Sequence, residues 1–262
     1  MRYASAALLL LFVPRALNAH DTWLLPDRFR VATGDSLGLG LTSGMDFPAP
    51  ESAVAADRLL TRRVRLAGRI QNLTLGKADQ ALRLSAALPS EGIAAAWVAT
   101  RPRTLTLTPE QVGEYLAEVG ATDTVGPVWK RSGQKSWRET YAKLAKTFVR
   151  VGETTDGSWA EPVGLGLELV PEADPTRLGV GDTLALRLLL DGRPLTGFPI
   201  GVVPALPGKP LLSRTDGQGR VSVRLDQAGP WMLRVTRIVP SAARPSEWDS
   251  TFTTLTVDVL PR

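Results

Sequence analysis

The chain has 262 residues, 44% of them hydrophobic and 22% charged, which is enough apolar content to bury a core and argues against disorder. Its formal net charge of +5 is only mildly basic and indicates no nucleic-acid partner. Cysteine is absent and His20 is the only histidine, so disulfides, thiolate metal sites, cysteine nucleophiles and two-histidine zinc motifs are excluded.

Residues 1–19 have the pattern of a secretory signal peptide. A basic residue, Arg2, precedes an apolar run over residues 6–13, and the small residue Ala19 stands just before His20. The run is too short to span a bilayer as a stable helix, and no later segment is long and apolar enough to do so. We expect cleavage within residues 16–20, directly before His20, and a periplasmic mature protein that is not itself transmembrane.

Residues 20–155 are predicted to form an N-terminal β domain. Four β-favouring stretches stand between glycine and proline residues, over residues 38–42, 62–66, 81–88 and 93–100. This pattern is typical of strands in a sandwich.

A helical insertion at about residues 109–148 interrupts the first domain. Thr108, Pro109 and Gln111 supply the residues of a capped helix start, and Gly120 is a natural stop. A second helix is predicted over residues 133–148, because large apolar residues recur there at helical spacing: Trp137, Tyr141, Leu144, Ala145 and Phe148. The other face of this helix would carry a solvated basic stripe of Arg138, Lys143 and Lys146.

Residues 160–262 are predicted to form a second β-sandwich, immunoglobulin-like or transthyretin-like. The turn-rich segment 152–162 marks the boundary. Strands are predicted over residues 163–170, 183–190, 198–204, 220–225, 231–239 and 251–259, with turn signals at Asp191-Gly192, Asp216-Gly217 and Gly229-Pro230. The expected fold class is therefore all-β and mainly antiparallel, with two sandwich-like parts and a short two-helix insertion in the first.

The residue that carries the most chemistry is His20. After the predicted cleavage its free α-amine and a ring nitrogen could bind one metal ion, closing a chelate ring within a single residue. An α-amino group titrates near pH ~8, so a divalent ion displaces its proton at modest cost. Two nitrogen ligands favour Cu(II) or Ni(II), with Zn(II) and Co(II) as alternatives. Further ligands would have to be oxygens or thioethers, and the candidates are Asp21, Asp46 and Met45.

No catalytic residue and no organic cofactor site is predicted. The only G-x-S-x-G match, at residues 34–38, stands in a glycine-bearing stretch that is predicted as turn and strand, not as a strand-to-helix nucleophile turn. The chain lacks a G-x-x-x-x-G-K-[ST] phosphate loop and a helix-opening G-x-G-x-x-G. A pair of carboxylates could act as in glycosidases, but many acidic residues here stand in turns, where their side chains bond local backbone. We therefore expect a non-enzymatic protein. The alternative to metal binding is a scaffold module whose sandwich loops engage a protein, a peptide or a glycan.

Several segments resemble a family of exported bacterial proteins known as domain of unknown function 4198, associated with nickel uptake. They are the opening HDTWLLP at residues 20–26, LVPEADP at 169–175, RTDGQGR at 214–220, GPW at 229–231 and EWDS at 247–250. The resemblance implies a periplasmic role in binding or delivering nickel or cobalt, a metal-uptake membrane transporter as partner, and His20 as ligand. Family members often carry another histidine after the GPW motif, where this chain has Arg237.

Overall fold

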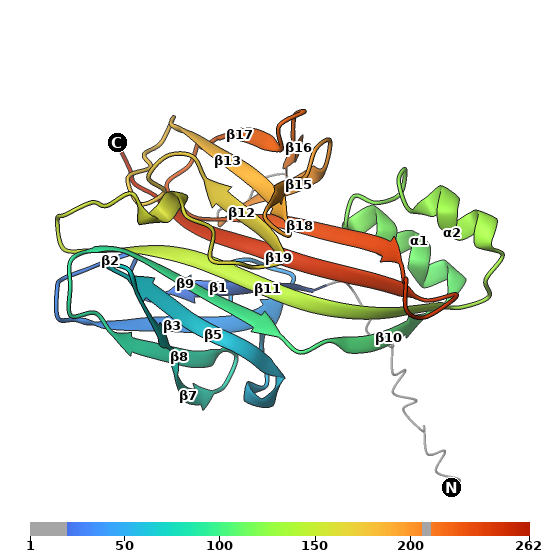
Figure 1. The fold of residues 1–262 in the computed structure, drawn as a ribbon, viewed down its shortest axis with the longest axis horizontal. Coiled ribbons are helices and arrows are strands. Elements are labelled where there is room, and N and C mark those ends of the chain that lie inside the picture. Colours follow the sequence, from blue (N-terminus) through green and yellow to red (C-terminus); the bar gives the residue numbers. More distant parts are fainter. Residues whose placement is uncertain (1–19, 206–210) are drawn as a thin grey trace, which may run out of the picture.

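The computed structural model describes residues 20–205 and 211–262, so the predicted signal peptide, residues 1–19, lies outside it. The described chain is mainly antiparallel β structure with two α-helices, as predicted (Figure 1). Its strands form three sheets of five, ten and four strands. None of the described helices is long and apolar enough to cross a membrane.

The five-stranded sheet consists of β1 (Asp21–Pro26), β3 (Ser36–Gly44), β4 (Ser52–Ala53), β7 (Thr74–Ala78) and β8 (Leu82–Ala87). The ten-stranded sheet consists of β2 (Arg30–Val31), β5 (Leu59–Leu66), β6 (Arg69–Asn72), β9 (Gly92–Thr100), β10 (Arg103–Leu107), β11 (Trp137–Val151), β15 (Pro199–Pro204), β16 (Leu211–Arg214), β18 (Gly229–Pro240) and β19 (Trp248–Val259). The four-stranded sheet consists of β12 (Leu167–Pro171), β13 (Thr183–Leu190), β14 (Arg193–Pro194) and β17 (Arg220–Arg224). Two short 3-10 helices, η1 (Ala56–Arg58) and η2 (Ser158–Ala160), lie between strands.

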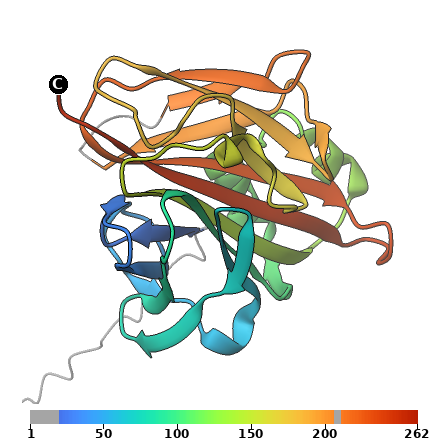
Figure 2. The ribbon, with the colours of Figure 1, turned by 60° about the vertical axis from the view of Figure 1, so that its left-hand side comes forward.

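The ten-stranded sheet is the middle layer between the two smaller sheets (Figures 1 and 2). Successive residues of a strand face opposite sides of its sheet. Along β9, Ile93, Ala95 and Trp97 join the core beneath β12, β13 and β17. Ala94, Ala96 and Val98 join the other core, beneath β1, β3 and β8. The molecule therefore has two sandwiches that share one layer.

Strands from both sides of the predicted boundary at 152–162 lie in this middle layer. The link is a parallel pair, in which β11 from the first part runs beside β19 from the second, with Glu139 opposite Trp248 and Thr147 opposite Thr256. The two sandwich-like parts thus have separate cores and a common sheet.

Two helices, α1 (Pro109–Glu118) and α2 (Gly126–Ser132), separate β10 from β11. The predicted capping box is present, because the side chain of Thr108 accepts from the backbone N–H of Gln111 and the Gln111 side chain accepts from that of Thr108. Gly120, with φ of +68°, follows the end of α1 as expected. The face of Val112, Tyr115 and Leu116 is buried against the far end of the middle sheet.

The predicted helix over residues 133–148 is wrong, because β11 occupies residues 137–151. Both faces of β11 are covered, Leu144 and Phe148 by one core and Ala145 and Val149 by the other. A strand buried on both faces has no alternation of apolar and polar residues, so its spacing imitates a helix. The insertion ends at Ser132, and Gly133 caps α2 in the left-handed conformation.

Two predicted features of the second part also differ in the structure. The strand expected over 163–170 begins only at Leu167, because the backbone N–H groups of Val163, Gly164 and Leu165 donate to the carboxylate of Glu168. Gly229-Pro230 is not a turn between strands but the first two residues of β18.

Candidate functional site

The predicted mature terminus, His20, lies immediately before β1 at the edge of the five-stranded sheet. Its carbonyl oxygen accepts a hydrogen bond of 2.5 Å from Nζ of Lys143 on β11. The next carbonyls along this edge are also bound, because Oγ1 of Thr254 donates to Thr22 and Oγ1 of Thr256 donates to Leu24. The backbone at His20 therefore has a fixed position against the middle sheet.

Lys143 is enclosed where it reaches His20. Its Nζ lies 5.9 Å from the ring centroid of Tyr141 and 5.7 Å from that of Phe252, distances at which an ammonium is attracted to an aromatic face. Burial lowers the pKa of Lys143 to about 8, and the negative charge of Asp21 opposes this shift. Lys143 acts as a donor that positions His20, the residue immediately before β1.

Asp21 forms an ion pair with Arg234 of β18, with 2.5 Å between Oδ2 and the guanidinium nitrogen. Burial raises the pKa of the Asp21 carboxyl, and the nearby charge of Arg234 opposes that rise. A metal ion that used this carboxylate would have to compete with Arg234.

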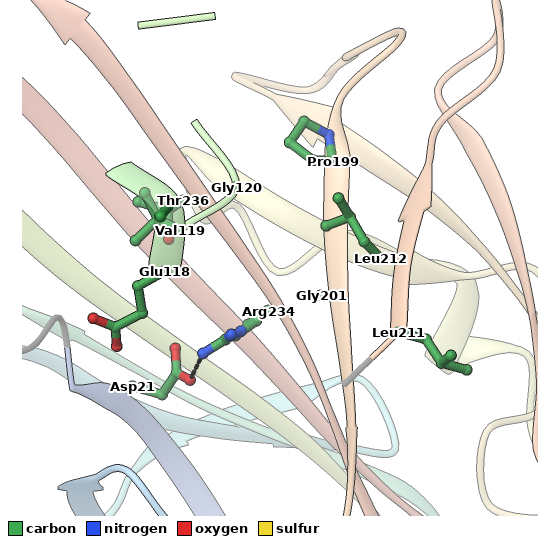
Figure 3. Close-up of a pocket in the computed structure, with 11 residues that line it drawn as sticks. Asp21, Glu118, Val119, Gly120, Pro199, Gly201, Leu211, Leu212, Arg234 and Thr236 are labelled. Atoms are coloured by element: carbon green, nitrogen blue, oxygen red, sulfur yellow. Dashed lines mark hydrogen bonds and ion pairs between the residues drawn. The ribbon is translucent and has the colours of Figure 1, made fainter. Parts of the chain in front are cut away.

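A cavity of about 200 Å³ opens on the Asp21 side of β1 (Figure 3). Asp21 reaches across it to Arg234, while the end of α1 and strand β16 lie on either side. The lining combines charged and apolar groups: Asp21, Ala117, Glu118, Val119, Gly120, Pro199, Gly201, Leu211, Leu212, Arg234 and Thr236.

Asp46 lies in the turn after β3, where its carbonyl accepts from the backbone N–H of Ala49 and its side chain is exposed. Within residues 20–205 and 211–262, no three histidine, aspartate or glutamate side chains come together as a group that could hold a metal ion. His20, Asp21 and Asp46 are thus not assembled into such a cluster. The predicted two-nitrogen chelate at His20 would need no cluster, since both its ligands would belong to one residue.

Met45, the other candidate ligand, directly follows β3. The last residue pair of the β1–β3 ladder is Asp21 with Gly44, so His20 and Met45 are the next residues along the two strands. The side chain of Met45 is 45% exposed.

Sequence reasoning missed Lys143 and Arg234 as neighbours of the predicted terminus at His20 and Asp21. Lys143 was predicted on the solvated face of a helix, whereas β11 places it beside His20. Arg234 is in a predicted strand, but its partner Asp21 is 213 residues away in the sequence, so no local signal relates them. Arg237, the position at which the resemblance led us to expect a second histidine, lies on the opposite face of β18 from Arg234 and Thr236, which line the cavity.

A family model described as a domain of unknown function (DUF4198) matches residues 17–238. The chain belongs to this family. A comparison of this DUF4198 protein with curated proteins finds no match.

Solved structures show weak similarity to this DUF4198 protein. A DUF4785 family protein from Legionella pneumophila is 11% identical, with a TM-score of 0.24, over 80% of this chain and 50% of that one. Elastase-activated alpha-2-macroglobulin from Escherichia coli is 11% identical, with a TM-score of 0.26, over 93% and 20%. A D1–D4 ectodomain fragment of ICAM-5 is 10% identical, with a TM-score of 0.23, over 92% and 51%. The chain spans from a fifth to about half of the length of these structures.

Proposed function

We propose that this protein is a non-enzymatic, periplasmic metal-binding or metal-delivery accessory protein for nickel, cobalt or copper, with His20 as its mature amino terminus. The observation that carries the proposal is the position of the only histidine. It directly follows a signal-like segment, and its backbone is held by Lys143 and by the start of β1.

A backbone that is fixed at the mature terminus would favour metal binding, because its ligands would lose less conformational freedom when the ion binds. A chelate at a mobile chain end must lose conformational freedom when it binds, which weakens affinity. Here the carbonyl of His20 is hydrogen-bonded and the next residue is in a strand. The α-amine and the imidazole therefore start from a restricted set of orientations. A metal-uptake membrane transporter is the partner that the family resemblance suggests.

The test is titration of purified mature protein, with its first residue verified by mass spectrometry. Calorimetry with Ni(II) and Cu(II) should give dissociation constants tighter than about 100 μM, equivalent to more than about 5.5 kcal/mol of binding free energy. His20→Ala keeps the α-amine and loses the ring, while acetylation of the amine keeps the ring and loses the other nitrogen. Both forms should bind weakly. Equal affinity in all three forms, or a different mature terminus, would rule the proposal out.

A second function is favoured by the edge of the middle sheet. The edge strand β16 carries Leu211 and Leu212, which are 54% and 61% exposed beside the Asp21 cavity. Exposed edge strands can pair with an added peptide strand. In this alternative the protein is a non-metal scaffold that engages a protein, a peptide or a glycan. The scaffold would be favoured if cells that produce the His20→Ala variant behave like wild-type cells. In that case cells that produce the double variant Leu211→Ser/Leu212→Ser should behave like cells that lack the protein.

A further inference from the structure

The β1–β3 ladder relates His20 to Met45. Its register pairs Asp21 with Gly44 and Thr22 with Ser43. Extended by one step beyond the last pair, this register would set His20 opposite Met45. Directly opposed residues of an antiparallel pair project from the same face, with Cβ atoms about 4.5–5.5 Å apart. By alternation, a His20–Met45 pair would lie on the same face as the Thr22–Ser43 pair.

The neighbouring pair shows that opposed side chains meet on this face. The hydroxyl oxygens of Thr22 and Ser43 lie 2.6 Å apart, within hydrogen-bond distance. Asp21, between the two pairs, faces the other way and reaches Arg234. The same register extended by one step would bring the side chains of His20 and Met45 to this face.

The segment that carries Met45 is held in place on both sides. The backbone N–H of Met45 donates to Oε2 of Glu51 at 3.1 Å. A Cβ on Gly44 would lie 2.9 Å from Cβ of Glu51 and 3.1 Å from the ring of Trp23, so this close approach needs a glycine. Two residues on, the ring of Phe47 packs edge-on against Trp23 at 5.6 Å. The backbone of Met45 is therefore fixed relative to β1.

The two methionines of the described residues have different surroundings. Met232 is 1% exposed in a cluster with Trp23 and Phe47, so its sulfur serves packing. Met45 is 45% exposed and adjoins the predicted terminus. A thioether is a soft ligand that suits Cu(I), whereas nickel and cobalt gain less from it.

We propose that Met45 is a thioether ligand beside the two nitrogens of His20, and that the site consequently selects copper, as Cu(I), over nickel. This rests on the proposed function of His20 and adds both a third ligand and a choice of metal.

The experiment compares wild type, Met45→Leu and Met232→Leu, each with its terminus verified. Cu(I) affinity is measured anaerobically by competition with a chromophoric chelator, and Ni(II) affinity by calorimetry. Met45→Leu should weaken Cu(I) binding by about tenfold or more. Even the loss of a residue that only hydrogen-bonds to a metal ligand typically lowers metal affinity by about that factor. Its Ni(II) affinity should stay within about twofold of wild type, because a thioether adds little for that ion. Met232→Leu should leave both affinities unchanged.

X-ray absorption of the Cu(I) form gives a second readout, a sulfur scatterer that Met45→Leu lacks. Equal Cu(I) affinity and equal spectra in wild type and Met45→Leu would overturn the Met45 proposal while leaving His20 as a ligand. Tighter binding of Ni(II) than of Cu(I) by wild type would overturn the selection of copper. If wild type binds neither ion, the proposed function itself fails.

Discussion

At the scale of single residues, Lys146 and Glu168 form an ion pair inside the protein. Both side chains are 1% exposed, and Nζ lies 2.6 Å from Oε1. Burial lowers the pKa of Lys146, and the adjacent charge of Glu168 opposes that shift. Glu168 also accepts hydrogen bonds from the three backbone N–H groups of residues 163–165. With Lys146, its carboxylate therefore has four hydrogen-bond donors. The pair connects β11 of the middle sheet to β12 of the sheet above it.

Lys146→Met should lower the free energy of unfolding by about 3–5 kcal/mol, because it leaves the carboxylate of Glu168 buried without a counter-charge. Urea denaturation followed by tryptophan fluorescence measures the loss. The control is Arg28→Ala, which removes a surface pair with Asp35 whose side chains are 65% and 37% exposed. That change should cost less than about 1 kcal/mol. Similar losses in the two variants would contradict the assigned role of the buried pair.

At the scale of elements, helix α1 is attached to the middle sheet through Glu139 of β11. This carboxylate is fully buried and accepts from the hydroxyl of Tyr115 on α1 at 3.0 Å, from the indole of Trp137 at 2.6 Å and from Ser250 of β19. Burial raises the pKa of Glu139, and the hydrogen bonds from Ser250, Trp137 and Tyr115 oppose that rise. The charge of Asp249 adds to the rise.

The raised pKa makes stability depend on pH in a defined direction. The folded protein holds the Glu139 proton more tightly than the unfolded chain, where the group titrates near 4.5. Between that pH and the higher folded pKa, the folded state binds more protons, so the free energy of unfolding falls as pH rises. Glu139→Gln removes this titration, and the stability of wild type relative to the variant should decline as pH increases above 4.5. If the difference in unfolding free energy between wild type and Glu139→Gln stays constant or grows as pH rises, the raised pKa of Glu139 is contradicted. The control is Glu114→Gln on the exposed face of α1.

The elements also show how far sequence alone could go. The capping box at Thr108 and the strand at 183–190 were predicted closely, because local hydrogen bonding and one-sided burial leave a local pattern. β11 was predicted as a helix because its burial on both faces depends on strands far away in the sequence. At the candidate site, His20 stands out in the sequence by its uniqueness and position, and its role as a metal ligand stays a prediction. Lys143 and Arg234 could not, since their contacts form only after β11 and β18 pack beneath β1.

At the scale of the whole molecule, the middle sheet ties the two parts together. Arg150 of the first part, 7% exposed, donates to Asp174 at 2.6 Å and to Thr176 at 2.8 Å in the second. Arg30 of the first part donates to the carbonyl of Thr176. Together with the parallel β11–β19 pair, these contacts join residues before the predicted boundary at 152–162 to residues after it. The parts are therefore expected to unfold in one transition, with coincident fluorescence and circular dichroism curves.

Residues 20–155 expressed alone should consequently fail to fold as a stable unit. Removing the second part uncovers the face of Ile93, Trp97, Leu144 and Phe148, each no more than 8% exposed in the whole protein. Burial of such a side chain contributes roughly 1.5–3 kcal/mol, so four together approach the ~5–15 kcal/mol net stability of a typical domain. The fragment also loses the β19 threonines that bind the carbonyls of β1. Binding of a hydrophobic dye and a broad, non-cooperative urea transition are the expected results. A sharp urea transition of the fragment at the midpoint of the full chain would show instead that the first sandwich folds independently. The contacts across the shared sheet would then not contribute to the free energy of unfolding.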